Sequence, residues 1–178
     1  MQNSTSTIIA LFVAAALVFV APIITLTDRN DNVAQENVKL IVEEFVTDIK
    51  NTGKITTSKY QDFENRLAAT GNSYNIEIEV QHLDENPGKK LTQANYTKIG
   101  ENVYYSEYTS QILEQILSRD GTEQAMLLKE GDIVYVQVSN ENSTAAQTLK
   151  GSLLNFSNEG EEVIKANSSG MVKTNGTK

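Results

Sequence analysis

The sequence of 178 residues contains no cysteine and a single histidine, His82. The lack of cysteine excludes disulfide bonds and thiolate metal sites. Basic residues are also scarce: 15 Lys and Arg stand against 23 Asp and Glu, which gives a net charge of −8. Nucleic-acid binding needs a basic surface that displaces counterions, so nucleic acid is not expected as a partner. The same charge argues against a protein that lies along an anionic membrane surface.

One stretch has no charged residue at all. Residues 8–26 read IIALFVAAALVFVAPIITL. At about 1.5 Å per residue this run reaches close to the ~30 Å of a bilayer core. A cleaved signal peptide would need a basic start, yet residues 1–7 hold no Lys or Arg, and Ala21 is followed by Pro22. A basic prepilin leader ending in Gly is also missing before the run.

We therefore expect residues 1–27 to be an uncleaved signal anchor that crosses the cell membrane once. The bulk of the chain is expected to be extracytoplasmic, because long segments translocate largely regardless of their charge.

Residues 28–53 have the pattern of an amphipathic stalk helix. Apolar residues recur at steps of three and four and fall on one helical face. They are Val38, Ile41, Val42, Phe45, Val46 and Ile49. Gly53 supplies the expected stop. If the polar stretch 28–32 is helical too, the anchor and the stalk form one rod of about 45 residues, with Pro22 bending it.

Residues 54–168 are expected to form an extracytoplasmic α+β head. Ser58 and Gln61 resemble a capping box for a helix, and strict alternation predicts a strand over 73–81. The pattern further predicts a helix from Tyr105 to Leu117, closed by Asp120 and Gly121. A hairpin is expected next, with strands 124–129 and 132–139 around Glu130 and Gly131.

The end of the head is less strongly patterned. A fourth helix is expected to begin near Asn142 or Ser143, and a short strand is expected at 162–166. A turn at 84–88 and a surface loop up to Gly100 are expected between the strand and the third helix. The tail, 169–178, is small and polar and is expected to fray. This order of elements indicates α+β, with a small antiparallel sheet covered on one face by helices.

Two candidate metal or catalytic sites fail on their own spacing. Asp28, Asn30 and Asn32 match the start of a calcium loop, but Val33 replaces the turn glycine and Lys39 the bidentate glutamate. His82 lies near Asp84 and Glu85 but has no second His or Cys to form a metal site, and no GxSxG elbow presents a nucleophile. A polar collar and a structural or solvent-exposed histidine are the favoured interpretations.

The paired carboxylates and the tyrosine cluster also have structural explanations. In each of the pairs Glu43/Glu44 and Glu161/Glu162, adjacent residues of a helix would point in different directions, so a solvated face is expected. The tyrosines Tyr104, Tyr105 and Tyr108 could bind glycans or partner chains, but their helical spacing favours a partly buried core patch. We expect no catalytic residue, cofactor-binding residue or metal ligand.

The chain resembles a group of known proteins in its order of parts and in several segments. These are ENVKLIVEEFVTDIKNTGKIT, ATGNSYNIEIEV, DENPG, GDIVYVQVSNENSTAAQTLKGSLLNF and the terminal SSGMV. They are similar to small membrane-anchored, pilin-like proteins (TadE-like or pseudopilin-like) of Tad-type pilus loci in Gram-positive bacteria. The resemblance implies a pilin-like component of a secretion or adhesion apparatus.

The sequence thus leads to a non-enzymatic, membrane-anchored structural or accessory subunit of a pilus or secretion apparatus. Its expected partners are membrane lipid and other subunits of the apparatus, with further copies of itself among the candidates. The alternative is an extracytoplasmic ligand-binding or sensor domain on a single anchor, which a pocket with converging polar groups would favour. An anchored hydrolase is a third hypothesis, which a perturbed carboxylate pair in a cleft would favour.

Overall fold

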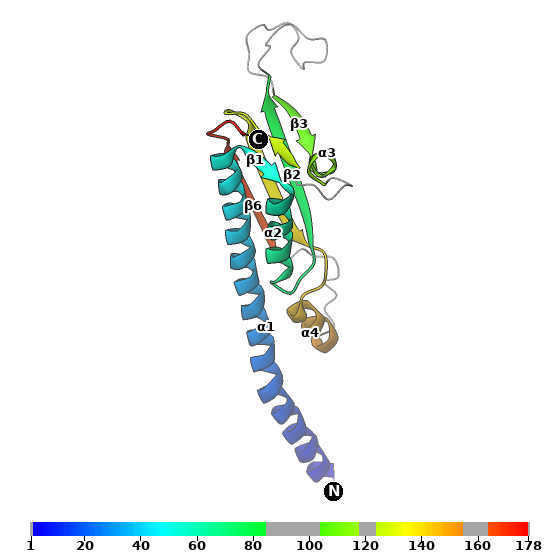
Figure 1. Ribbon diagram of the computed structural model, residues 1–178. Coiled ribbons are helices and arrows are strands. Elements are labelled where there is room, and N and C mark those ends of the chain that lie inside the picture. The colour runs from blue at the N-terminus through cyan, green and yellow to red at the C-terminus, as the bar shows by residue number, and fades with distance from the viewer. Residues whose placement is uncertain (1, 85–103, 118–123, 155–163, 178) are drawn as a thin grey trace, which may run out of the picture.

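A computed structural model describes residues 2–84, 104–117, 124–154 and 164–177, and Figure 1 shows a long helix with an α+β head on its C-terminal half. The elements are α1 (Gln2–Thr52), β1 (Lys54–Thr56), α2 (Thr57–Ala68), β2 (Tyr74–Leu83), β3 (Tyr104–Tyr108), α3 (Thr109–Ile116), β4 (Ala125–Leu127), β5 (Ile133–Asn140), α4 (Ala145–Leu154) and β6 (Lys165–Met171). Apart from Asp84, the turn expected at 84–88 and the loop up to Gly100 lie outside the described residues, as do the stop at Asp120 and Gly121 and the pair Glu161/Glu162.

Helix α1 is a single rod that includes the polar stretch 28–32. Pro22 lies inside the helix and does not end it. The helix stops where the sequence predicts: Gly53 has a φ of 63°, and its N–H donates to the carbonyl of Ile49 at 2.8 Å. Glycine adopts this left-handed conformation without the clash that a Cβ would cause.

The main sheet has four antiparallel strands in the order β3-β2-β5-β6. Paired residues of β2 and β5, such as Ile78 with Val136, share the buried face. The amphipathic face of α1 packs on this side, and α2 and α3 complete the same core. The fold is therefore α+β with small antiparallel sheets, as the sequence predicts.

Strand β6 has small side chains on the face that α1 covers. Ala166, Ser168 and Gly170 pair with the buried valines of β5 and so lie on the face that α1 covers. A Cβ on Gly170 would lie 2.4 Å from Cδ of Lys50, so no larger residue fits there without a shift. Small side chains on β6 let the helix backbone lie near the sheet.

The expected fraying of the C-terminal tail is wrong. Residues 169–171 form the last part of β6, which begins at Lys165, later than the sequence suggests. Val172 is buried and its N–H donates to the carbonyl of Asp132, while Lys173 donates to the carbonyl of Lys50. Backbone pairing, which does not depend on apolar side chains, holds this polar segment in place.

The expected hairpin is also wrong. Strand β4 pairs with β1 in a separate two-stranded sheet and not with β5. The backbone of Leu128 explains the difference, because its N–H donates to the carbonyl of Gly53 and its carbonyl accepts from Gly176. These bonds hold β4 beside the end of α1.

The third helix begins later than its apolar pattern predicts. Tyr104–Tyr108 is the edge strand β3, paired with β2, and α3 starts only at Thr109. Tyr105 and Tyr108 are each 57% exposed, so the expected tyrosine core patch is wrong. The apolar residues Ile112 and Ile116 of the same pattern are buried, as predicted.

The helix caps differ from the predicted residues by one or two positions. Thr56, not Ser58, caps α2 by accepting the N–H of Lys59. Thr144, not Asn142 or Ser143, caps α4: its hydroxyl accepts the N–H of Gln147, and the Gln147 side chain accepts the N–H of Thr144. This reciprocal pair is a capping box.

Candidate functional site

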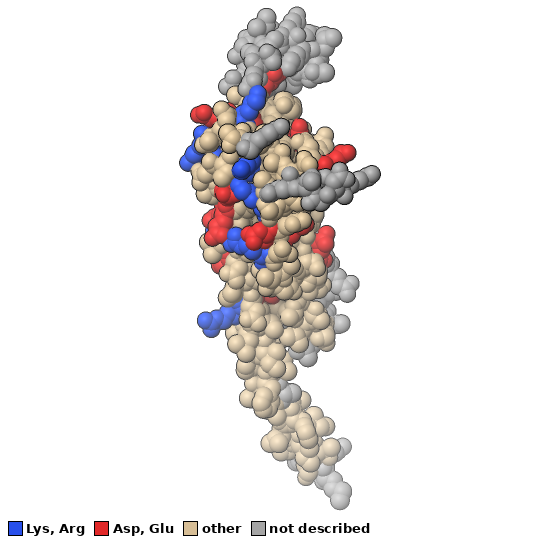
Figure 2. Space-filling model, viewed as in Figure 1, with Lys and Arg blue, Asp and Glu red and all other residues tan. Residues whose placement is uncertain are grey.

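The most unusual surface of the molecule is the N-terminal half of α1. Its large apolar side chains are bare on all sides, with Leu11 70%, Phe12 72% and Phe19 71% exposed. In Figure 2 this part of the rod carries no blue or red atoms, whereas charged side chains cover the head. Within the described part of the chain, α1 is the one helix long and apolar enough to cross a membrane.

The exposed half gives way to the docked half over two turns of helix. Asp28 forms an ion pair with Lys150 of α4 at 2.6 Å, and Asp31 accepts a hydrogen bond from the Thr144 hydroxyl at 2.6 Å. One turn later, the Gln35 side chain bonds both backbone groups of Lys165 at the start of β6. Polar contacts thus fasten α1 to the head as soon as the apolar run ends.

The calcium-loop interpretation fails in the structure as well. Asp28, Asn30 and Asn32 belong to α1, and residues two apart on a helix point in different directions. No group of three or more His, Asp or Glu among the described residues could hold a metal ion.

The docked half of α1 is buried on the face that the sequence predicts. Val38, Val42 and Ile49 are each 0% exposed. Phe45 stacks on Phe63 of α2 with ring centroids 4.2 Å apart and planes 8° from parallel. The two halves of one helix therefore have opposite surroundings.

His82 belongs to a polar cluster that holds the sheet end together. Its Nδ1 lies 2.9 Å from Oδ2 of Asp132, a residue that is 1% exposed. Asp132 also accepts the N–H groups of Lys129 and Leu83. The hydrogen-bond partner of Nδ1 of His82 is thus a residue fifty positions away, and no spacing in the sequence pointed to it.

The other ring nitrogen of His82 does not complete a catalytic set. Nε2 is buried without a hydrogen bond to any described residue and lies 3.9 Å from Oε1 of Glu107. A cavity of about 370 Å³ adjoins this cluster, and its described lining contains no Ser or Thr that could act as a nucleophile. The cluster is best explained as a structural link between β2, β3 and the turn before β5.

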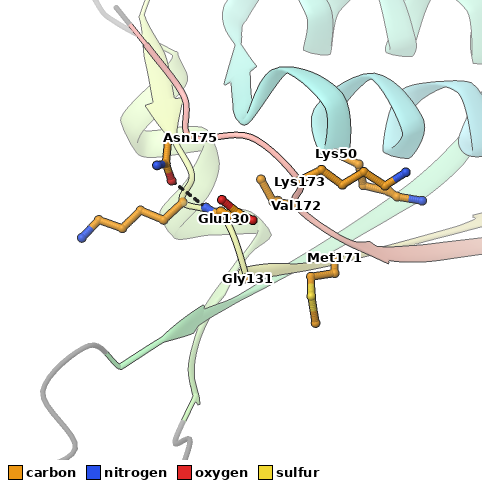
Figure 3. Close-up of a pocket in the computed structure, with 8 residues that line it drawn as sticks. Lys50, Glu130, Gly131, Met171, Val172, Lys173 and Asn175 are labelled. Carbon is orange, nitrogen blue, oxygen red and sulfur yellow. Dashed lines mark hydrogen bonds between the residues drawn. The ribbon is translucent and has the colours of Figure 1, made fainter.

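A larger hollow of about 790 Å³ lies at the C-terminal end of α1. In Figure 3, Lys50 and Lys173 extend in the same direction, away from Glu130 and Gly131, and Asn175 accepts the N–H of Glu130 at 2.8 Å. None of the polar side chains that line this hollow is buried. The hollow is thus lined by lysine side chains but has no buried polar side chain that could orient a ligand.

Among the described residues, Tyr60 and Glu79 have displaced pKa values. Burial is the largest cause that raises the pKa of Tyr60 above its ordinary value, and the hydrogen bond to Glu64 and the negative charge of Glu64 raise it further. Hydrogen bonds from Gln81 and then Ser106 lower the pKa of Glu79, on the face of the sheet opposite α1. Both shifts follow from local contacts, and neither group lines the cavity beside His82. Of the glutamate pairs, Glu44 contacts Arg66 in an exposed ion pair.

Comparison with known proteins adds no relative. No protein-family model, curated protein or solved structure matches the chain.

Proposed function

We propose that this protein is a non-enzymatic, membrane-anchored, pilin-like subunit or accessory component of a pilus or secretion apparatus. The observation that carries the proposal is the division of α1 into a bare apolar half and a half docked in the head. In this proposal the anchor lies in the cell membrane and the head faces away from the cytoplasm.

The bare half of α1 requires a covering that the head does not provide. Each large apolar side chain left in water forgoes about 1.5–3 kcal/mol of burial free energy. A contiguous apolar surface of this kind is characteristic of membrane or protein contact. A bilayer covers every side of a helix at once, and neighbouring subunits cover it when they pack helix against helix.

The continuity of α1 supports a role in assembly. An unbroken helix fixes the head relative to the anchor, so packing between anchors also positions the heads. The resemblance to pilin-like proteins of Tad-type pilus loci agrees with this arrangement. The ligand-binding alternative would rest on the cavity beside His82. It receives less support, because Asp132 already makes three hydrogen bonds within the cluster and the unbonded Nε2 of His82 has almost no exposed surface that a ligand could reach.

Cysteine cross-linking in membranes tests the proposal, since the chain has no native cysteine. We expect a Val13→Cys variant to sediment with membranes after alkaline carbonate extraction and to keep the mass of the uncleaved chain. Oxidation should then join the introduced thiol to the same thiol of a second copy in a disulfide. An Asn75→Cys variant, on the sheet face opposite α1, is the matched control and should remain uncross-linked.

The two readouts separate the two parts of the proposal. Release by carbonate, or a mature N-terminus near Pro22, would overturn the membrane anchor. Membrane-bound protein that forms no cross-link through Val13→Cys would leave the anchor standing and overturn the pilin-like assembly.

A further inference from the structure

Helix α4 stands apart from the rest of the head. Figure 1 shows it beside α1 and beyond the end of the sheet, on the side of the exposed N-terminal half. Two side-chain contacts join this part of the head to α1: the Asp28–Lys150 ion pair, and the hydrogen bond from the hydroxyl of Thr144, at the N-cap of α4, to Asp31. We call these two contacts the α4 latch. We propose that the latch holds α4 in the lipid headgroup layer of the membrane that α1 crosses.

The position of the latch along α1 leads to this inference, which rests on the proposed membrane anchor. Asp28 follows Leu26, the last residue of the apolar run, by two residues, or about 3 Å of helix. Asp31 is about 8 Å beyond Leu26 by the same rise. The headgroup region on each side of a bilayer is about 5–8 Å thick. If the apolar run fills the hydrocarbon core, the partners of Asp28 and Asp31 on α4 lie at headgroup depth.

The composition of α4 fits this environment. Lys150 is the one charged residue from 144 to 154, and Asp28 neutralises it. The exposed positions Ala145, Thr148 and Ser152 are small and uncharged. Figure 2 shows no cluster of red atoms over α4, although the chain carries a net charge of −8. Helix α4 itself therefore adds no negative charge where it would meet anionic lipids.

The partner surface is consequently the polar headgroup layer and not the hydrocarbon. Of the α4 side chains that the structure describes, the exposed ones include no large apolar residue that would insert between acyl chains. The exposed hydroxyls of Thr148 and Ser152 instead form hydrogen bonds with the hydrated headgroup layer. Anchor and α4 together would give the head two points of contact with the membrane, which restrains its tilt.

Tryptophan quenching tests this placement, because the chain contains no tryptophan. The probes are Thr148→Trp on α4, Phe19→Trp in the anchor and Tyr105→Trp as a distal control. Tyr105 pairs with His82, eight residues along β2 from Tyr74 and so about 26 Å up the strand. Each full-length variant is reconstituted into phosphatidylcholine vesicles that carry a spin label either on the headgroup or deep in the acyl chain.

We expect the headgroup label to quench Thr148→Trp several-fold more than Tyr105→Trp, and the acyl-chain label to quench Phe19→Trp. Equal, weak quenching of Thr148→Trp and Tyr105→Trp, with Phe19→Trp quenched, would overturn the headgroup placement alone. If Phe19→Trp escapes the acyl-chain label, the proposed anchor itself is overturned. Unchanged circular dichroism of each variant verifies that the head is folded.

A second variant tests the latch. The double variant Asp28→Ala/Asp31→Ala in the Thr148→Trp background should lower quenching by the headgroup label, because α4 loses both contacts of the latch. Glu44→Ala, which removes the exposed pair with Arg66 on the docked half, is the matched control and should leave quenching unchanged. Equal quenching in both backgrounds would show that the latch does not hold α4 in place.

Discussion

The two halves of α1 contain similar apolar residues in opposite surroundings. Phe12 is 72% exposed and Phe45 is 6% exposed, although both are phenylalanines of one continuous helix. The difference lies in spacing: residues 8–26 are apolar on every side, whereas the apolar residues of 38–49 form a single stripe. A stripe matches one flat sheet face, but an all-round apolar surface matches only a surrounding environment. Pattern, more than hydrophobic content, decides which half the head itself covers.

The comparison also separates two contributions to free energy. Each of the six buried side chains of the docked stripe contributes about 1.5–3 kcal/mol of burial to the stability of the head. The exposed half contributes nothing to the folding of the head, because it does not contact the sheets. Its apolar surface instead favours transfer out of water. Substitutions in the two halves should therefore have different measurable consequences.

The largest expected effect comes from Phe45→Ala. The substitution removes a buried ring and its stacking on Phe63, so we expect the free energy of unfolding of the head to fall by about 3–5 kcal/mol. Denaturant unfolding of the full chain in detergent micelles, followed by the near-ultraviolet circular dichroism of tyrosine, measures the change.

Phe19→Ala is the control from the exposed half. It removes the same ring from a position that is 71% exposed, so the unfolding midpoint of the head should remain unchanged. A similar loss in both variants would contradict the division of α1 into two independent halves. An unchanged midpoint in Phe45→Ala would mean that the stripe is not docked on the sheet.

A smaller loss is expected from Gly53→Ala, at the end of the docked half. A Cβ there would lie 2.1 Å from the carbonyl oxygen of Thr174, and the residue has a positive φ. We expect a loss of about 2–4 kcal/mol from backbone strain and overlap together. Gly71→Ala is the control, because Gly71 also has a positive φ but has no atom within 4 Å of an added Cβ.

Gly71→Ala should cost only the strain of the left-handed backbone, about 1–2 kcal/mol. The difference between the two losses, read from unfolding midpoints on the same chain, reports the crossing of the C-terminal segment over the end of α1. Equal losses would indicate that this segment moves aside freely.

Strong periodicity made parts of the fold predictable. The stripe from Val38 to Ile49, its stop at Gly53 and the alternation of Tyr74 to Val80 each depend on a local pattern that the structure preserves. The buried positions Tyr60, Phe63 and Leu67 of α2 follow from the same kind of spacing. In these segments the residues that form the core also define the secondary structure.

Features set by distant backbone contacts were not predictable. Strand β4 pairs with β1 because Leu128 bonds Gly53 and Gly176, and these contacts leave no periodic signal. Strand β6 is small and polar because α1 crosses close above it, so its sequence resembles a loose tail. Asp132 joins His82 from fifty residues away. Asp132 follows Gly131 at a turn, which is a common pattern and does not indicate that His82 is its partner.

The smallest expected effect lies at the border between the two halves. Asp28 and Lys150 form an ion pair at 2.6 Å, but their side chains are 42% and 40% exposed. Water screens such a pair, so a double-mutant cycle with Asp28→Asn and Lys150→Gln should give a coupling of about 0.2–1 kcal/mol for the chain in detergent micelles. The coupling should decrease as salt is added, because mobile ions screen exposed charges. A coupling of several kcal/mol that salt does not change would mean that the pair is buried, and the border between the anchor and the head would then lie N-terminal to Asp28.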